Sequence, residues 1–496
     1  MLQYEIEHEG KKFFGNVALK EIHPFEYGDD FYLLDVEGMV PHKIPESIYL
    51  NIARVSSYPS SLIPEARMQD LRNLNLVQEE EDRPQGSPVN AASNETTAPA
   101  NPNEGENGDG SGKEPETGVV SIALLVAQEC NMSCIYCYGQ GGGYGGGGMM
   151  SEETAFKAVD WLMENSKKAE RVNVSFFGGE PLLNFTLIQK VVEYAKDAAH
   201  GKGKKVTFSI TTNATLFTDE IISFMSREKI YPLVSFDGTL ETQNRQRPFK
   251  GGRGSYETVR ANIRKLLEVY PRLAARAIVY GDANPLAIEA GMREVGLTSC
   301  SVGLSSPVIL ARQDGDTFPG GAAENTVGPM IELSKKEKDD LLLSVKDRRV
   351  IENSIAALTH MLISGKKLYF GCGVGKAMVG ISVAGEIYPC HRFVGQEELK
   401  MGNVESYRVK GLNEYYRAVV CSIPGCQFCW ARYFCGGGCF YHNKAYTGDM
   451  HLPVSSFCEI KKAALEIAIS AYFKMDEGDR EFLKTTYSDR SEDKIP

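Results

Sequence analysis

The sequence predicts an α/β protein built on a parallel sheet. Between residues 119 and 306, six apolar segments with the composition of strands alternate with five segments of helical spacing. This alternation is typical of parallel strands joined by crossover helices, in a sheet that is either doubly wound or closed into a partial barrel. With 42% hydrophobic residues in 496, the chain can bury a sizeable core. In both architectures the catalytic groups gather at the carboxyl ends of the strands.

A small α+β unit is predicted at residues 1–78. The stretches 11–19 and 30–38 alternate apolar and polar residues as strands do, and 44–55 and 64–77 have helical spacing. Residues 79–118 contain no aromatic residue, and Val89 is their only large aliphatic one. Such a segment buries too little apolar surface to offset the entropy lost on ordering it. We therefore expect a disordered linker at 79–118.

The predicted elements of the α/β region follow one another in a regular order. The expected strands are 119–127, 172–177, 205–212, 231–236, 273–280 and 301–306, and the expected helices are 151–165, 184–199, 218–228, 255–269 and 285–295. Ser151 is in place to cap the first helix. We assign 119–334 to this domain, 335–369 to a bridging helical segment, 370–475 to a cysteine-rich domain that ends in an amphipathic helix, and 476–496 to a C-terminal tail.

The charge and hydropathy patterns argue against two classes of partner. The formal net charge of -11 disfavours nucleic acid, because phosphate binding needs a basic surface. No apolar run approaches the roughly 18 residues that span a bilayer, and the N-terminus lacks the pattern of a secretion signal. We expect a cytoplasmic protein without membrane contact, in which the twelve cysteines serve metal or redox sites rather than disulfides.

Three cysteines directly follow the first predicted strand, at the rim where a site is expected. Cys130, Cys134 and Cys137 have the spacing C-x3-C-x2-C. Three thiolates leave one position open in the four-ligand shell of an iron–sulfur cluster or a zinc site. A substrate or cofactor can occupy that position. The alternative is a structural zinc loop that takes its fourth ligand from elsewhere in the chain.

This triplet, with Tyr136 before its last cysteine, resembles the radical S-adenosylmethionine (SAM) superfamily. Two later segments support the resemblance, since Gly178-Gly179-Glu180-Pro181 is similar to the family's GGE motif and 235–238 to its SxDG motif. The resemblance implies a partial (β/α)6 barrel in which the triplet holds a 4Fe–4S cluster and SAM chelates the open iron. Tyr136, the GGEP stretch and Ser235 would lie around SAM, with the Glu180 carboxylate near its ammonium. Reductive cleavage of SAM would yield a 5′-deoxyadenosyl radical that takes a hydrogen atom from the substrate.

A glycine-rich run at 139–148 joins the triplet to the first helix of the domain. We interpret it as a mobile flap that carries Tyr144 near the substrate entrance, and packing-neutral filler is the alternative. Thr212 and Asn213 end the third predicted strand at the same rim.

Seven cysteines near the C-terminus have a second regular spacing. Cys372 is followed by twelve residues, Gly385, four residues and Cys390; then come C-x2-C-x5-C-x3-C from Cys426 to Cys439 and, last, Cys458. This pattern resembles the SPASM domain of radical SAM enzymes that modify peptides and proteins. The resemblance implies two auxiliary 4Fe–4S clusters, and zinc is the alternative metal. One cluster would be held by Cys426, Cys429, Cys435 and Cys458, and the other by Cys372, Cys390 and Cys439.

The second of these sets is one cysteine short. Some relatives carry a further cysteine about six residues before the Cys372 position, where this chain has Lys366. The iron left open could bind a substrate thiolate, since coordination to a metal deprotonates a thiol. Cys421 is the alternative fourth ligand.

The residue after Cys390 helps to choose among the reactions of the family. Sulfatase-maturing relatives carry an aspartate there as a base, whereas this chain has His391. The segments 244–259, 389–395 and 429–439 instead resemble maturases that form a thioether from a cysteine sulfur to a carbon of another residue in a ribosomally made precursor peptide. His391 is a candidate base because the pKa of histidine lies near neutrality, and a packing role is the alternative.

The N-terminal unit is consistent with such a maturase. Residues 30–76 are similar to the winged-helix element that binds the leader of the precursor by adding a strand to its sheet. A structural subdomain is the alternative. The linker would hold a captured precursor at high effective concentration near the active site.

The resemblance also implies an electron donor such as ferredoxin or flavodoxin. Other radical peptide modifications on the same scaffold are the rival functions, among them carbon–carbon crosslinking, epimerisation and quinone-cofactor maturation. A non-catalytic iron–sulfur or leader-binding protein is the rival from another class.

Overall fold

The computed structural model describes residues 2–8, 11–19, 21–57, 63–64, 72–74, 77–78, 118–306, 323–349, 351–406, 415 and 417–493. The predicted linker, apart from its last residue, lies outside the described residues, and so does most of the predicted helix at 64–77. No helix in the described part of the chain is both long enough and apolar enough to cross a membrane.

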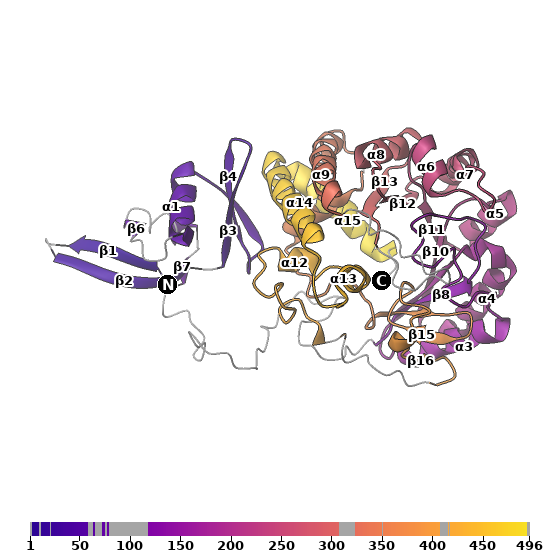
Figure 1. Cartoon of the computed structure of the whole chain (residues 1–496). Coiled ribbons are helices and arrows are strands. Elements are labelled where there is room, and N and C mark those ends of the chain that lie inside the picture. The colour runs from indigo at the N-terminus through magenta and orange to yellow at the C-terminus, as the bar shows by residue number, and fades with distance from the viewer. Residues whose placement is uncertain are drawn as a thin grey trace.

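The described residues contain one nine-stranded sheet, in the order β13-β12-β11-β10-β9-β8-β14-β15-β16, which lies in the right-hand part of the molecule in Figure 1. Its six parallel strands match the predicted segments: β8 (Ser121–Ala127), β9 (Arg171–Gly178), β10 (Lys205–Thr212), β11 (Ile230–Ser235), β12 (Ala274–Val279) and β13 (Ser299–Leu304). They lie side by side in sequence order, without the reversal of a doubly wound sheet. This order decides between the two predicted architectures in favour of an open, barrel-like sheet.

Helices connect the parallel strands and lie around the sheet (Figure 1). Ser151 caps the first of them as predicted, because its hydroxyl accepts a hydrogen bond from the Thr154 amide. Ala155, Val159 and Leu162 form the face that this helix buries. A 3-10 turn, η2 (Pro181–Asn184), precedes the second of these helices. The helices are α3 (Glu152–Asn165), α4 (Phe185–Gly201), α5 (Asp219–Arg227), α6 (Leu240–Gln246), α7 (Tyr256–Val269) and α8 (Pro285–Glu294). Neither α6 nor η2 was predicted.

The cysteine-rich region extends the sheet with three strands that the sequence did not predict. Strand β14 (Met378–Ile381) pairs in parallel with β8, and β15 (Glu386–Tyr388) and β16 (Gly402–Asn403) continue in antiparallel fashion. The chain packs tightly where β14 passes Cys390: a Cβ on Gly380 would lie 2.6 Å from the Cys390 carbonyl carbon. Cys390 is therefore fixed beside β14, the direct neighbour of the strand that leads to Cys130.

Four helices form a second packed layer, and they share one core. These are α9 (Ala323–Lys346), α10 (Ser354–Ser364), α14 (Ser455–Lys474) and α15 (Glu477–Asp493), with the shorter η3 (Glu397–Leu399), α12 (Arg432–Cys435) and α13 (Phe440–Thr447) nearby in the chain. Two results differ from the predictions. The bridging segment is two helices rather than one, and the predicted tail is largely helix α15, in which Asp479 is fully buried.

The N-terminal unit contains two sheets and a helix. Strands β1 (Leu2–His8) and β2 (Lys11–Leu19) pair with the short β6 (Ile63–Pro64) and β7 (Val77–Gln78), and β3 (Ile22–Tyr27), β4 (Asp30–Asp35) and β5 (Val40–Ile44) form a second sheet followed by α1 (Glu46–Ser57). The predicted strands at 11–19 and 30–38 correspond to β2 and β4, and the predicted helix at 44–55 corresponds to α1, whereas β5 was not predicted.

The β3–β5 sheet packs directly against the helical layer. Phe25, Tyr32 and Leu34 are buried in the same core as residues of α10 and α14. The His23 ring stacks on Trp430 at a centroid distance of 3.6 Å. Contact with a distant part of the chain therefore fixes this sheet in place, which the prediction of a separate unit did not include.

Candidate active site

The loop after β8 brings the cysteine triplet to the carboxyl edge of the sheet. Burial raises the pKa of Cys130 to about 11 and that of Cys134 to about 12, and the nearby Cys137 thiol adds to both shifts. Thiols that oppose one another's ionisation lie close together. Because metal binding requires thiolates, a cationic group among the three would remove this cost.

The arrangement of the cysteines also bears on the kind of metal centre that they could form. Among the residues with described positions, no group of three or more His, Cys, Asp or Glu side chains is arranged to hold a single metal ion. The cysteine ligands of a 4Fe–4S cluster bind separate iron atoms, so they surround the group rather than converge on one point. The mutual influence of the three thiols fits such a group.

The GGEP stretch packs against the backbone that leads into the triplet. A Cβ on Gly178 would lie 2.0 Å from the Ala127 carbonyl oxygen, and one on Gly179 would lie 2.2 Å from the Glu129 carbonyl oxygen. The Gly179 and Glu180 amides donate to these same two carbonyl oxygens, each at 2.8 Å. Glycine is thus required at both positions by the close approach of two backbone segments.

Glu180 is fully buried, and both of its carboxylate oxygens accept hydrogen bonds from the protein. The Thr212 hydroxyl and the Asn213 amide donate to it at 2.8 Å, and the Leu182 amide donates at 3.1 Å. Burial raises its pKa to about 7 even though these hydrogen bonds oppose the shift. Glu180 is therefore a brace between the ends of β9 and β10, and the predicted contact of its carboxylate with a ligand ammonium stays a prediction.

Asn213 connects this brace to the triplet. Its side-chain nitrogen lies 3.8 Å from the Cys130 sulfur and donates to the Asn131 side chain at 2.9 Å. The sequence placed Thr212 and Asn213 at this rim, and the structure gives them their specific partners.

Tyr136 is held by a buried polar network on the opposite side of the triplet. Its hydroxyl donates to Asp237 at 2.6 Å, and Asp237 also accepts from Gln246 at 2.8 Å and pairs with the Arg247 Nε at 3.0 Å. The guanidinium of Arg247 lies 5.1 Å from the centre of the Tyr136 ring. Ser235 ends β11 two residues before Asp237, at the same edge of the sheet.

The glycine-rich run is not an open flap with an exposed tyrosine. Tyr144 is 3% exposed, and its hydroxyl donates to the Gly178 carbonyl oxygen at 3.2 Å. Gln128 donates to the Gly143 carbonyl oxygen at 3.1 Å and accepts from the Val383 amide at 2.9 Å. The Tyr144 ring thus anchors the run over the GGEP turn, which corrects the interpretation of Tyr144 as an entrance residue.

The seven C-terminal cysteines fall into the two expected sets. Burial raises the pKa of Cys390 to about 12, with a further contribution from Cys439, and the pKa of Cys372 is raised by burial and by Cys439. In the other set, burial raises the pKa of Cys426 to about 12, and the nearby thiols that add to it are Cys435, Cys458 and Cys429. Both sets thus resemble the first triplet in the proximity of their thiols, and cluster binding by each stays a prediction.

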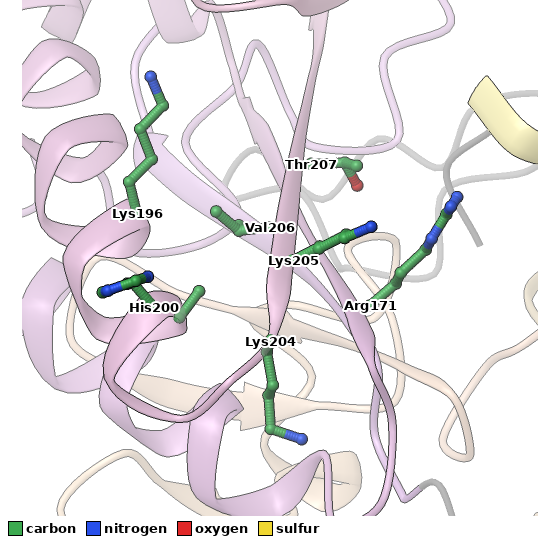
Figure 2. Close-up of a pocket in the computed structure, with 8 residues that line it drawn as sticks. Arg171, Lys196, His200, Lys204, Lys205, Val206 and Thr207 are labelled. Carbon is green, nitrogen blue, oxygen red and sulfur yellow. The ribbon is translucent and has the colours of Figure 1, made fainter.

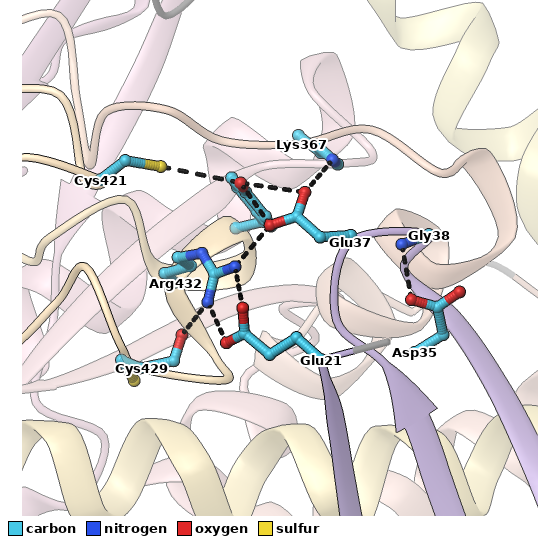
Figure 3. Close-up of polar contacts among 9 residues, drawn as sticks. Glu21, Asp35, Glu37, Gly38, Lys367, Cys421, Cys429 and Arg432 are labelled. Carbon is cyan, nitrogen blue, oxygen red and sulfur yellow. Dashed lines mark hydrogen bonds and ion pairs between the residues drawn. The ribbon is translucent and has the colours of Figure 1, made fainter. Parts of the chain in front are cut away.

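Cys421 lies elsewhere. Its sulfur donates to the Tyr433 hydroxyl at 3.6 Å, beside Glu37 of the N-terminal unit (Figure 3). This position does not support Cys421 as the missing fourth ligand of the three-cysteine set.

His391 sits in a packed and cationic environment. Its ring lies 4.2 Å from the ring of Phe177, measured between centroids. Burial lowers its pKa to about 3, and Arg392 and Arg276 lower it further. The ring contact supports the packing alternative, and a role for His391 as a base stays a prediction.

A basic pocket of about 440 Å³ lies away from these groups (Figure 2). It is lined by Arg171, Lys196, His200, Lys204 and Lys205, among others. Arg171 and Lys205 begin β9 and β10, so the pocket is at the amino ends of the strands and is not part of the candidate site.

Comparisons with known proteins agree with this geometry. Residues 124–285 match the Radical SAM superfamily. An uncharacterized protein of Methanocaldococcus jannaschii is 36% identical over 138 residues, which is 28% of this chain and 45% of that protein. The radical SAM cyclopropyl synthase TigE of Paramaledivibacter caminithermalis is 29% identical over 25% of this chain and 28% of its own length. The match thus spans less than half of either relative.

Longer similarities are weaker in identity. The serine-type anaerobic sulfatase-maturating enzyme of Bacteroides thetaiotaomicron is 25% identical over 67% of this chain and 85% of that enzyme. The structure of native anSMEcpe with bound AdoMet superposes with a TM-score of 0.59 at 18% identity, over 71% of this chain and 98% of the other. Residues 124–285 thus match the radical SAM superfamily, and the chain shares its fold with anSMEcpe over 71% of its length.

Proposed function

We propose that this protein is a radical SAM enzyme that modifies a ribosomally made precursor peptide by joining a cysteine sulfur to a carbon of an acceptor residue. The observation that carries the proposal is the second three-cysteine set, Cys372, Cys390 and Cys439, beside the sheet that presents the first set. Both sets are one ligand short of four. One open position suits SAM, and the other suits a substrate thiolate.

The first set, Cys130, Cys134 and Cys137, would hold a 4Fe–4S cluster with SAM on its open iron. When bound and reduced, this pair supplies a 5′-deoxyadenosyl radical. The chain contributes the surroundings: Gly178 and Gly179 approach the backbone before Cys130 closely because they lack side chains, and the Asp237 network fixes Tyr136. Gly178, Gly179, Pro181 and Ser235 lie at the same edge, where they would contact SAM.

The second set would hold an auxiliary cluster whose open iron binds the thiol of a substrate cysteine. Coordination to a metal deprotonates a thiol and fixes its sulfur in place. Cys372 is exposed, as expected for a ligand of an iron that a substrate thiol must reach. Cys426, Cys429, Cys435 and Cys458 would hold the second auxiliary cluster.

The N-terminal unit would bind the leader of the precursor. Strand β3 lies against α14, where His23 contacts Glu466 at 3.1 Å. In the described sheet, β5 is the edge strand on the other side, and an added strand could pair there. Arg432 holds this sheet in place by pairing with Glu21 and Glu37 (Figure 3). A precursor captured at β5 would be tethered close to the cluster-binding domain.

The relatives support a peptide substrate. One structure of anSMEcpe contains AdoMet and the Cp18Cys peptide, and its fold matches this chain with a TM-score of 0.59. The sulfatase-maturating enzymes act on proteins, by their names, and TigE is a cyclopropyl synthase. A cytoplasmic location and an electron donor such as ferredoxin or flavodoxin belong to the same proposal.

Another radical modification of a peptide is the second candidate. The similarity to a cyclopropyl synthase and to sulfatase-maturating enzymes favours keeping it, because one scaffold serves several reactions in those relatives. The products differ: a thioether removes two hydrogen atoms and one free thiol per crosslink, whereas epimerisation changes no mass and a carbon–carbon crosslink spares the thiol.

The test begins with anaerobically reconstituted full-length protein. We expect about twelve irons per chain, the content of three 4Fe–4S clusters, and 5′-deoxyadenosine from SAM only when Cys134 is intact. A Cys134→Ala variant is the matched control. Cysteine-containing peptides encoded beside the gene are then incubated with the enzyme, and product mass and free thiols are measured. Bound zinc without 5′-deoxyadenosine would exclude the radical reaction.

A further inference from the structure

Arg392 occupies an unusual position between two cysteine sets. Its guanidinium lies 4.7 Å from the centre of the Tyr138 ring and 4.6 Å from that of the Tyr441 ring. Tyr138 directly follows Cys137 of the first set, and Tyr441 follows Cys439 of the second set by two residues. The two rings therefore hold one cation at the junction of the two cysteine-bearing segments.

The same guanidinium contacts a cysteine sulfur. Its Nη1 lies 3.8 Å from the Cys439 sulfur, and its Nη2 donates to the Ser306 hydroxyl at 3.3 Å. Both partners are neutral when Cys439 is protonated. The aromatic faces stabilise the cation further, but they carry no formal charge.

The buried arginines Arg247 and Arg432 have carboxylate partners, whereas Arg392 is partly buried. Arg247 pairs with Asp237, and Arg432 pairs with Glu21 and Glu37. No carboxylate contacts Arg392 in the part of the chain that the structure describes, and Arg276 adds a second positive charge nearby. Even a partly buried charge without a counter-charge loses hydration, which is costly. The geometry thus calls for a negative group at Cys439.

We propose that Arg392 is a positioning residue that stabilises the reduced state of the auxiliary cluster held by Cys372, Cys390 and Cys439. This inference rests on the proposed function, because it requires a cluster at these cysteines. One-electron reduction makes the cluster one charge more negative, and a fixed cation at its sulfur ligand stabilises that state more than the oxidised one. Hydrogen bonds to cluster sulfurs and the local charge are known determinants of the potential.

A raised potential would also serve the reaction. Thioether formation takes a hydrogen atom from the acceptor carbon, releases the thiol proton and leaves one electron over. A cluster that is easier to reduce accepts this electron more readily. Arg392 would thus favour transfer of this surplus electron from the new carbon–sulfur bond to the cluster.

The experiment uses the full-length chain with Cys130, Cys134 and Cys137 replaced by alanine, so that only auxiliary clusters remain. Potentiometric titration followed by electron paramagnetic resonance measures their potentials, and the transition that disappears in an added Cys390→Ala variant identifies the relevant cluster. Arg392→Gln and Arg392→Met remove the charge, and Arg392→Lys keeps it. Arg276→Met is the matched control, since it removes a neighbouring cation that contacts no cysteine sulfur.

We expect the two neutral variants to lower the reduction potential of this transition by at least 59 mV, which for one electron is a tenfold change in the redox equilibrium constant. Arg392→Lys should retain most of the potential, and Arg276→Met should shift it less than the neutral Arg392 variants do. An unchanged potential in a neutral variant with full iron content would overturn the inference. So would loss of iron from both neutral variants with Arg392→Lys unaffected, because Arg392 would then act in assembly.

The outcome separates this inference from the proposed function. A shifted potential without any thioether product would leave Arg392 in its role and reject the peptide reaction. A thioether product, together with a cluster potential that does not change in the Arg392 variants, would support the peptide reaction and reject the role of Arg392.

Discussion

Replacing Glu180 with alanine tests whether this residue is a brace or a ligand contact. In the structure its carboxylate accepts from the Thr212 hydroxyl and from the Leu182 and Asn213 amides. The Glu180→Ala variant leaves two buried backbone N–H groups and one hydroxyl without this acceptor. We therefore expect a large loss of stability, accompanied by loss of the first cluster because Asn213 also contacts Cys130.

The size of the effect follows from the number of lost hydrogen bonds. A buried donor left without a partner costs about 1–3 kcal/mol, so the two amides alone cost at least about 2 kcal/mol and more with the hydroxyl. For a domain of 150–250 residues each kcal/mol lowers the melting temperature by about 2–4 °C. A loss of about 3 kcal/mol thus predicts a drop of about 6–12 °C, measured by circular dichroism on the metal-free protein.

Two further variants sharpen the test. Thr212→Val removes one donor and should lower the melting temperature less than Glu180→Ala. Glu180→Gln keeps one acceptor oxygen, so SAM affinity, measured by calorimetry on the reconstituted protein, should change less than tenfold. A melting temperature equal to that of the wild type in Glu180→Ala, together with a tenfold or greater loss of SAM affinity in Glu180→Gln, would refute the brace and restore the ammonium contact.

Three other predictions concern separate parts of the molecule. Burial raises the pKa of Glu337 from 4.5 to about 7, so the protonated form is favoured on folding and stability should fall by about 3 kcal/mol as pH rises from 4.5 to 7; Glu337→Gln should flatten this dependence in thermal melts, and an unchanged slope would contradict it. Cys421→Ser should keep its full iron content, whereas Cys439→Ser should lose about four irons, and equal losses would place Cys421 at a cluster. A Cβ at Gly142 would lie 2.6 Å from the Gly179 Cα, while one at Gly145, also of positive φ, has open space; Gly142→Ala should therefore lower iron loading more than Gly145→Ala, and similar values would argue against the contact.

The sequence was sufficient for the parallel strands and for the three groups of cysteines. Six apolar runs that alternate with amphipathic helices predict a parallel sheet, because a crossover helix between two consecutive strands leaves them parallel. The cysteine groups were visible because ligand spacing is local in the chain. Both signals lie within a few residues, so long-range packing was not needed to find them.

The features that the sequence did not reveal depend on contacts between distant segments. Strands β14 to β16 are short, and β14 exists only because β8, more than 250 residues earlier in the chain, offers it a partner edge. The docking of β3–β5 likewise depends on Trp430 and Arg432. A strand of four residues or an acidic side chain carries no sign of such a partner. Arg392 was also missed, although a basic residue beside a metal-binding cysteine is a signal that could have found it.

The glycines of the site show how a family motif can be required by the fold before any ligand binds. Gly178 and Gly179 exclude a Cβ because the backbone before Cys130 passes directly over them, and Gly142 excludes one because Gly179 lies beneath it. Three backbone segments thus approach one another closely at this point, and the Tyr144 hydroxyl donates to the Gly178 carbonyl oxygen. A substitution at Gly179 would push the loop of Cys130 away from the sheet whether or not SAM is present. Conserving this motif would therefore protect the position of the first cysteine as much as a contact to the cofactor.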